Sequence, residues 1–106
     1  MDIFLKKTFV HTMGFDEPIY EWDPHKAETN LRKHGVSFAE AITALFDERA
    51  LTREDPDAEG EQRFVTLGSN DTGVLLVVVF THRGSTYRLI SARKANTPER
   101  RRYEET

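Results

Sequence analysis

Apolar residues change their spacing about halfway along the chain, and this change divides the sequence into a helical half and a strand half. Between residues 24 and 46 they recur at intervals of three and four, the spacing of one helical face. From residue 62 to residue 94 they form short runs separated by turns rich in Gly, Asn, Asp and Ser. Such turns predict antiparallel strands in a meander. Helices followed by a run of strands predict an α+β fold.

The first predicted helix spans residues 24–34 and follows a short strand at residues 19–22. Asp23 is its expected N-cap, and Pro24 favours the first helical turn. Gly35 supplies the left-handed residue that ends the helix. A stripe at offsets of four and three is expected to face the core: Ala27, Leu31 and His34.

The second predicted helix spans residues 37–46 and is the stronger packing element. Ser37 and Glu40 form a capping box, in which each side chain accepts a hydrogen bond from the other residue's backbone N–H. Four apolar residues follow at the offsets of a buried face: Phe38, Ala41, Ile42 and Leu45. We expect the two helices to form an N-terminal helical hairpin packed on one face of the sheet. The other face then stays open for function or for a partner.

The strand half begins after an acidic loop at residues 54–61. A short strand is possible at Leu51-Thr52, before that loop. Three strands follow: residues 62–68, 74–81 and 86–94. The middle one is apolar on both faces, so it should be central and most buried. A short C-terminal helix comes last, with Thr97 as its expected N-cap and Pro98 at its first position.

Length and composition fit one small domain without a membrane span. The chain has 106 residues, enough for one core, and its longest apolar run is of strand length. We expect a single domain at residues 19–106, preceded by a tail or loosely docked strand at residues 1–18. The absence of Cys and of a secretory signal pattern favours the cytoplasm.

The net charge of −3 conceals an uneven distribution. Residues 47–61 contain seven acidic side chains and two arginines, whereas residues 83–106 contain seven basic and three acidic ones. A local basic face fits a protein that meets phosphate at one place. The alternative is an ordinary solvated surface.

Three arginines in the strand half are candidates for contacting phosphate: Arg63, Arg88 and Arg93. The planar guanidinium group binds phosphate oxygens in pairs and stays charged. Such groups can stabilise the charge that develops when a ribose 2′-hydroxyl attacks its neighbouring phosphate. The alternative is that Arg63 and Arg88 form ion pairs with neighbours such as Glu61. Arg88 and Arg93 differ by an odd number, so in a regular strand they would point to opposite faces.

Two further side chains could assist proton transfer. His34 ends a helix, where the dipole favours its protonated form, although a capping or packing role is an alternative. Tyr103, in the basic last helix, could stack on a base, donate a proton or dock on the sheet. No histidines have metal-ligand spacing, and the acidic loop lacks the last ligand of a calcium loop. We therefore expect neither metal nor cofactor.

Several segments in this order resemble the BrnT toxins of bacterial type II toxin–antitoxin systems. The shared segments are residues 20–27, 30–38, 61–64 and 88–95, with Glu99-Arg100 and Tyr103-Glu104. The most specific are Lys-His-Gly-Val-Ser-Phe, residues 33–38, and Ile-Ser-Ala-Arg, residues 90–93. The resemblance covers about residues 19–105.

This resemblance implies a RelE-like fold and a metal-independent endoribonuclease that slows translation and growth. It implies a BrnA-like antitoxin as partner, RNA as substrate, and contact with operator DNA only through the antitoxin. Carried onto this chain, the best catalytic or phosphate-binding candidates are Arg63, Arg88 and Arg93, followed by His34 and Tyr103. The alternative function is a non-catalytic module that acts only by binding an antitoxin and its operator complex.

Overall fold

One mixed sheet carries all the helices of the described chain. The computed structural model describes residues 9–12 and 18–106, with side chains from residue 18 onward. In chain order the elements are β1 (Phe9–Thr12), β2 (Ile19–Trp22), α2 (Pro24–His34), α3 (Phe38–Leu45), β3 (Leu51–Glu54), β4 (Phe64–Ser69), β5 (Leu75–Arg83), β6 (Thr86–Lys94) and α4 (Thr97–Glu104). The strand order is β1-β2-β6-β5-β4-β3. This arrangement confirms the predicted α+β class.

The sheet combines a predicted meander with an unpredicted parallel pair. β3 to β6 form consecutive antiparallel neighbours, as the short turns indicated. β2 pairs with β6 in parallel, so the sheet is not wholly antiparallel as expected. No turn joins these two strands, and the pairing therefore left no local signal in the sequence. β1 lies within the segment predicted as a tail or docked strand and pairs with β2. The rest of that prediction lies outside the described residues, apart from Pro18.

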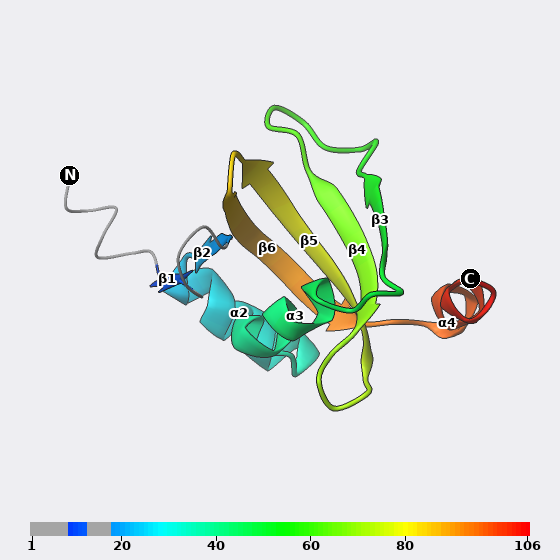
Figure 1. The fold of residues 1–106 in the computed structure, drawn as a ribbon. Coiled ribbons are helices and arrows are strands. Elements are labelled where there is room, and N and C mark those ends of the chain that lie inside the picture. Colours follow the sequence, from blue (N-terminus) through cyan, green and yellow to red (C-terminus); the bar gives the residue numbers. More distant parts are fainter. Residues whose placement is uncertain (1–8, 13–17) are drawn as a thin grey trace, which may run out of the picture.

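α2 and α3 lie on the same side of the sheet, whereas α4 stands apart from them beside β4 (Figure 1). α2 packs on β6, and α3 packs on β4, β5 and β6. Both helices contact the sheet more than each other, so the close helical hairpin that we expected is not confirmed. Their termini are as predicted: Asp23 caps α2, Gly35 ends it at φ 71°, and Ser37 and Glu40 form the capping box of α3.

The inward stripe predicted for α2 is partly wrong. Leu31 is 50% exposed, while Asn30 is buried in its place. The offsets from Ala27 to Asn30 to His34 fit a helical face as well as the predicted set does. The polarity of Asn30 hid this alternative, because an amide is buried only when its hydrogen bonds are satisfied.

Two further boundaries differ from prediction. The N-cap of α4 is Asn96 rather than Thr97: its side chain accepts from the N–H of Glu99 at 2.9 Å, and the Glu99 carboxylate accepts from the N–H of Asn96 at 2.9 Å. Asn caps helices at least as well as Thr, and the reciprocal bond to Glu99 decides the position. β4 begins at Phe64 rather than at residue 62.

The main hydrophobic core lies between the sheet and the two helices α2 and α3; we call this side of the sheet the helix-covered face. Its cluster of buried residues consists of Tyr20, Trp22, Val36, Phe38, Ala41, Ile42, Ala44, Leu76, Val78, Phe80, Leu89 and Ala92. A smaller cluster of Leu67, Leu75 and Val77 lies elsewhere, with Val65 and Tyr103 packed against it. Since Val77 alternates with Leu76 and Val78 along β5, this second cluster lies on the opposite face. β5 is accordingly buried on both faces, as predicted.

Candidate active site

A bulge in β6 brings Arg88 and Arg93 to the same face of the sheet. Val79 pairs with Ser91, but the next residue, Phe80, pairs with Leu89, so β6 has one extra residue at this point. Beyond the bulge Thr81 pairs with Arg88, and before it Val77 pairs with Arg93. Thr81 and Val77 are four residues apart and therefore share a face. This face, opposite α2 and α3, is called the arginine face below.

Arg88 lies in a pocket of about 250 Å³ at one end of the arginine face. The pocket is lined by Glu21, Glu61, Thr81, Arg83, Thr86 and Arg88. The Arg88 guanidinium donates to the Glu21 carboxylate at 2.9 Å, with side-chain exposures of 35% and 16%. Glu61, the partner suggested by the sequence, instead pairs with Arg83 at 2.5 Å. The pocket thus holds two arginines, each paired with a carboxylate.

Arg93 is held by Glu99, the first-turn acid of α4. Two guanidinium nitrogens of Arg93 donate to the two carboxylate oxygens of Glu99, at 2.9 and 2.7 Å. This pair raises the pKa of Arg93, and it lowers the pKa of Glu99 although burial opposes the effect. A bidentate pair fixes orientation as well as charge. α4 therefore determines where the Arg93 side chain points.

Arg63 immediately precedes β4 and is half-buried. Its carbonyl accepts from the N–H of Asp55 at 2.8 Å, which continues the β3–β4 ladder beyond Phe64. The alternation that puts Val65 on the arginine face therefore puts Arg63 there too. Within residues 18–106, the Arg63 guanidinium has no carboxylate in ion-pair contact.

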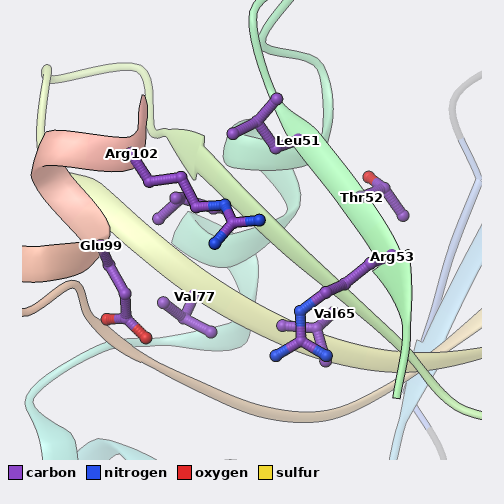
Figure 2. Close-up of a pocket in the computed structure, with 8 residues that line it drawn as sticks. Leu51, Thr52, Arg53, Val65, Val77, Glu99 and Arg102 are labelled. Atoms are coloured by element: carbon purple, nitrogen blue, oxygen red, sulfur yellow. The ribbon is translucent and has the colours of Figure 1, made fainter. Parts of the chain in front are cut away.

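A second pocket, of about 340 Å³, lies on the arginine face between β3, β4, β5 and α4. Figure 2 shows Arg53 and Arg102 extending over an aliphatic floor that includes Val65 and Val77, with Glu99 at the side. The complete lining is Leu51, Thr52, Arg53, Val65, Leu67, Val77, Glu99 and Arg102. Because Glu99 also holds Arg93, this pocket adjoins the Arg93 side chain.

Tyr103 lies on the arginine face but is already engaged. Its hydroxyl donates to Asp47 at 2.5 Å, and the same carboxylate oxygen accepts from the N–H of Ser69 at 2.8 Å. The bond to Asp47 and burial both raise the pKa of Tyr103. Burial raises the pKa of Asp47, but the hydrogen bonds that its carboxylate accepts lower that pKa by more. The pKa of Asp47 therefore lies below its usual value. The Arg49 guanidinium lies 5.3 Å from the centre of the Tyr103 ring. Tyr103 therefore fastens α4 to the end of α3 and to β4.

His34 is separated from the arginines. It is the half-buried last residue of α2, and α2 packs on β6 from the helix-covered face. Arg88 and Arg93 extend from the other face of that strand. The structure thus brings Arg63, Arg88, Arg93 and Tyr103 to one face and leaves His34 on the other.

Asn30 is the residue that sequence reasoning missed most clearly. Its side-chain N–H groups donate to the carbonyls of Val36 at 3.0 Å and Ala92 at 2.8 Å, and its carbonyl oxygen accepts from the N–H of Ala92 at 3.1 Å. β2 pairs with β6 only as far as Arg88, so Asn30 takes the place of a strand at Ala92. The residue clamped in this way is the one before Arg93.

The acidic partners of the arginines were also missed. Glu21 belongs to β2, and its register opposite Arg88 depends on the unpredicted parallel pairing. Glu99 carried a signal, because a Glu in the first turn of a helix at this distance from Arg93 is within reach of it. The residues described contain no cluster of three or more His, Asp or Glu side chains arranged to hold a metal. No helix among them is long and apolar enough to span a membrane.

Comparison with known proteins gives the family. The model of the BrnT ribonuclease toxin of type II toxin–antitoxin systems matches residues 22–99, more than half of the chain. A solved structure, the Brucella abortus ribonuclease toxin BrnT, is similar at 28% sequence identity and a TM-score of 0.53, over 72% of this chain and 94% of that one. No match was found among curated protein sequences. The chain belongs to the BrnT family of ribonuclease toxins.

Proposed function

We propose that this chain is a metal-independent, RelE-like endoribonuclease that uses Arg63, Arg88 and Arg93 to bind the scissile phosphate of RNA. The observation that supports it best is the β6 bulge, which gives Arg88 and Arg93 a common face. Arg63 joins that face from the neighbouring end of β4. Cleavage of RNA by such a site would inhibit translation and growth, and it would act in the cytoplasm.

The reaction suited to this face is transesterification at phosphorus. The ribose 2′-oxygen loses its proton and forms a bond to the phosphorus, while the bond from phosphorus to the leaving 5′-oxygen breaks and that oxygen takes up a proton. Charge accumulates on the non-bridging oxygens during the exchange. Guanidinium groups held in place before the reaction stabilise that charge without a cost of reorganisation.

The carboxylates keep the arginines in place until RNA arrives. Glu21 holds Arg88 and Glu99 holds Arg93 through charge-assisted hydrogen bonds. A phosphate offers the same fork geometry as a carboxylate, so it can replace either partner. Arg63, with no carboxylate contact in residues 18–106, is the guanidinium that a phosphate meets without competition.

Of the two candidates for proton transfer, Tyr103 is the one on the arginine face. Its hydroxyl carries a proton at neutral pH, which a donor to the leaving oxygen needs, and the bond to Asp47 that raises its pKa makes it a weaker acid while that bond lasts. To act in this way it must exchange its bond with Asp47 for one with the substrate. His34 would need a route around the sheet, so we assign it no step.

The family implies an antitoxin, and we propose that it is a BrnA-like protein that covers the arginine face. The aliphatic floor and the arginines of the pocket at α4 suit an acidic, partly apolar segment of such a partner. Operator DNA would then be contacted through the antitoxin only.

A second candidate is a non-catalytic module that acts only through an antitoxin complex. One observation favours it: Arg88 and Arg93 are both paired with carboxylates, as in a structural ion-pair network. The two candidates differ in whether purified protein changes RNA.

The test is cleavage of RNA by the purified protein in EDTA, with and without translating ribosomes. Cleavage by the wild type, lost in Arg88→Ala, supports the endoribonuclease. Intact RNA under both conditions, from protein that is folded and binds its antitoxin, supports the binding module.

A further inference from the structure

A third pocket, which the proposed function does not use, lies where the helix-covered face extends past the end of α3. Its volume is about 260 Å³. It is lined by Leu45, Thr52, Phe64, Thr66, Phe80, His82 and Tyr87, and we call it the aromatic pocket. The other pockets on the sheet have aliphatic or charged walls, whereas four of these seven residues carry rings.

The rings form a row across β4, β5, β6 and β2 that includes a solvent-exposed imidazole. His82 stacks on Tyr87 with ring centres 4.3 Å apart and planes at 18°. Tyr87 stacks in turn on the buried Tyr20, at 5.3 Å and 29°. Phe64 meets His82 edge-on at 6.4 Å and 74°. The imidazole of His82 therefore lies between Tyr87 and Phe64 and remains accessible to solvent.

Two hydroxyl groups supply polarity inside this apolar pocket. The hydroxyls of Thr52 and Thr66 are 2.7 Å apart, and Thr66 is only 2% exposed. A hydroxyl offers one donor and two acceptor positions, so their mutual bond leaves hydrogen-bonding capacity unused. A flat ligand with polar edges could use that capacity.

We propose that the aromatic pocket binds one unpaired nucleobase of the RNA substrate. This inference rests on the proposed ribonuclease function and adds a base subsite to it. Proteins recognise unpaired bases by stacking them on aromatic side chains and bonding their edges. At roughly 30 Å³ per water molecule the pocket holds about nine waters, comparable to the roughly ten non-hydrogen atoms of a purine.

β5 connects the base subsite to the arginine face. Thr81, His82 and Arg83 are consecutive, and their side chains alternate between the faces. Thr81 and Arg83 line the pocket of Arg88, while His82 lines the aromatic pocket. One RNA strand passing over the β5–β6 turn therefore meets guanidinium groups on one side and rings on the other.

The test is equilibrium binding of a single-stranded oligonucleotide with 2′-O-methyl riboses, which cannot be cleaved by 2′-hydroxyl attack. Stacking of one base contributes an amount that corresponds to a roughly 5- to 150-fold change in affinity. We expect His82→Ala to weaken binding within this range and His82→Phe to restore it. His25→Ala, a matched change at an exposed histidine of α2, should leave binding unchanged.

The oligonucleotide gives an independent readout. Bases are replaced one at a time by abasic sites. At one position the replacement should lower the affinity of the wild type, and it should not change the affinity of His82→Ala. Equal binding by wild type and His82→Ala, with both folded by thermal unfolding, overturns the proposal. The proposal is also overturned if His82→Ala loses affinity for the antitoxin alone, because the pocket would then bind a protein side chain. Base-dependent binding without cleavage would retain the subsite and reject the catalytic proposal alone.

Discussion

The two faces of the sheet share the same strands but differ in their interactions: apolar packing dominates one face and ion pairs dominate the other. Under α2 and α3, the helix-covered face is a hydrophobic core in which Phe38, Leu76 and Leu89 are almost completely buried. The arginine face has a small apolar cluster and holds Arg88 and Arg93 through carboxylates. Burial of apolar side chains stabilises this core. On the arginine face, the carboxylates that hold the arginines are proposed to be displaced by an anion.

β6 shows this difference within one strand. Leu89 and Ala92 enter the core, while Arg88 and Arg93 leave from the other side. The bulge makes both assignments possible, because it shifts the alternation once between the two arginines. Asn30 then fixes the strand next to Arg93 from the core side. The face that provides stability thus positions the face that is proposed to provide chemistry.

The largest expected effect is on activity, from Arg88→Ala. Loss of one preorganised donor to a developing anion typically reduces kcat by about 10²- to 10³-fold. We expect a loss of that size in RNA cleavage by purified protein, with far-ultraviolet circular dichroism and the thermal midpoint close to those of the wild type. This would show that the arginine face is separable from the core.

The matched control for Arg88→Ala is Arg32→Ala, an exposed arginine on α2. It removes the same charge from the protein but leaves the arginine face unaltered. Arg88→Lys should recover only part of the activity, because lysine lacks the fork geometry. If Arg88→Ala cleaves RNA as fast as the wild type, the proposed catalytic role of the arginine face is wrong.

The next largest effect is on stability, from Asn30→Ala. The substitution leaves the Ala92 N–H and the carbonyls of Ala92 and Val36 without their partner in a buried setting. An unsatisfied buried polar group costs about 1–3 kcal/mol. We expect the free energy of unfolding in urea to fall by about 2–4 kcal/mol.

Leu31→Ala tests the same helix at its exposed position. A change of less than about 0.5 kcal/mol is expected there, as for other surface substitutions. A larger loss from Leu31→Ala than from Asn30→Ala would restore the stripe predicted from the sequence. It would also contradict the role of Asn30 as a clamp.

Much of the helix-covered face could be predicted because its signals are local. Caps such as Asp23 and Ser37 mark helix starts by bonds within three residues, and Gly35 marks an end by its left-handed backbone. Apolar spacing then identifies the buried side of α3. The exception is Asn30, whose partner Ala92 is 62 residues away. The local spacing of apolar and polar residues does not indicate a contact between residues so far apart in the sequence.

The arginine face was predictable in composition but not in arrangement. The sequence shows three arginines in the strands, and their chemistry points to phosphate. It does not show the bulge, because no Gly or Pro marks it. Nor does it show that β2 lies parallel to β6 and brings Glu21 opposite Arg88. Geometry that depends on pairing between distant strands cannot be derived from spacing alone.

A smaller effect on stability is expected from Gly68→Ala, where β4 passes under the end of α3. A Cβ on Gly68 would lie 2.5 Å from the carbonyl oxygen of Ala44, a backbone atom that cannot rotate away. Overpacking of this kind costs about 1–3 kcal/mol. Urea unfolding measures the loss, and RNA cleavage per folded molecule should be unchanged.

Ser91→Ala is the corresponding one-atom change on the arginine face. Ser91 pairs with Val79 and is half-buried, and we expect a change within about 0.5 kcal/mol. If the two substitutions destabilise the protein equally, the packing contrast between the faces is wrong at these positions.

The ion pair between Arg93 and Glu99 is expected to make a small contribution to stability that is lost in acid. The hydrogen bond from Arg93 lowers the pKa of Glu99 below its ordinary value of 4.5. A depressed carboxyl pKa adds stability that is complete above the unfolded-state value and is lost as the pH falls through the folded-state value. The wild type should therefore lose this contribution below about pH 4.5, and Glu99→Gln should lack it at every pH.

The measurement is the difference in free energy of unfolding between wild type and Glu99→Gln from pH 7 down to pH 2. We expect a difference of no more than about 1 kcal/mol at neutral pH, typical of a partly exposed pair, that shrinks as Glu99 is protonated. Asp47, whose pKa is also lowered, titrates in both proteins and cancels in the difference. A difference that stays constant with pH would mean that the charge of Glu99 adds no stability, and that Arg93 is not held in the way described.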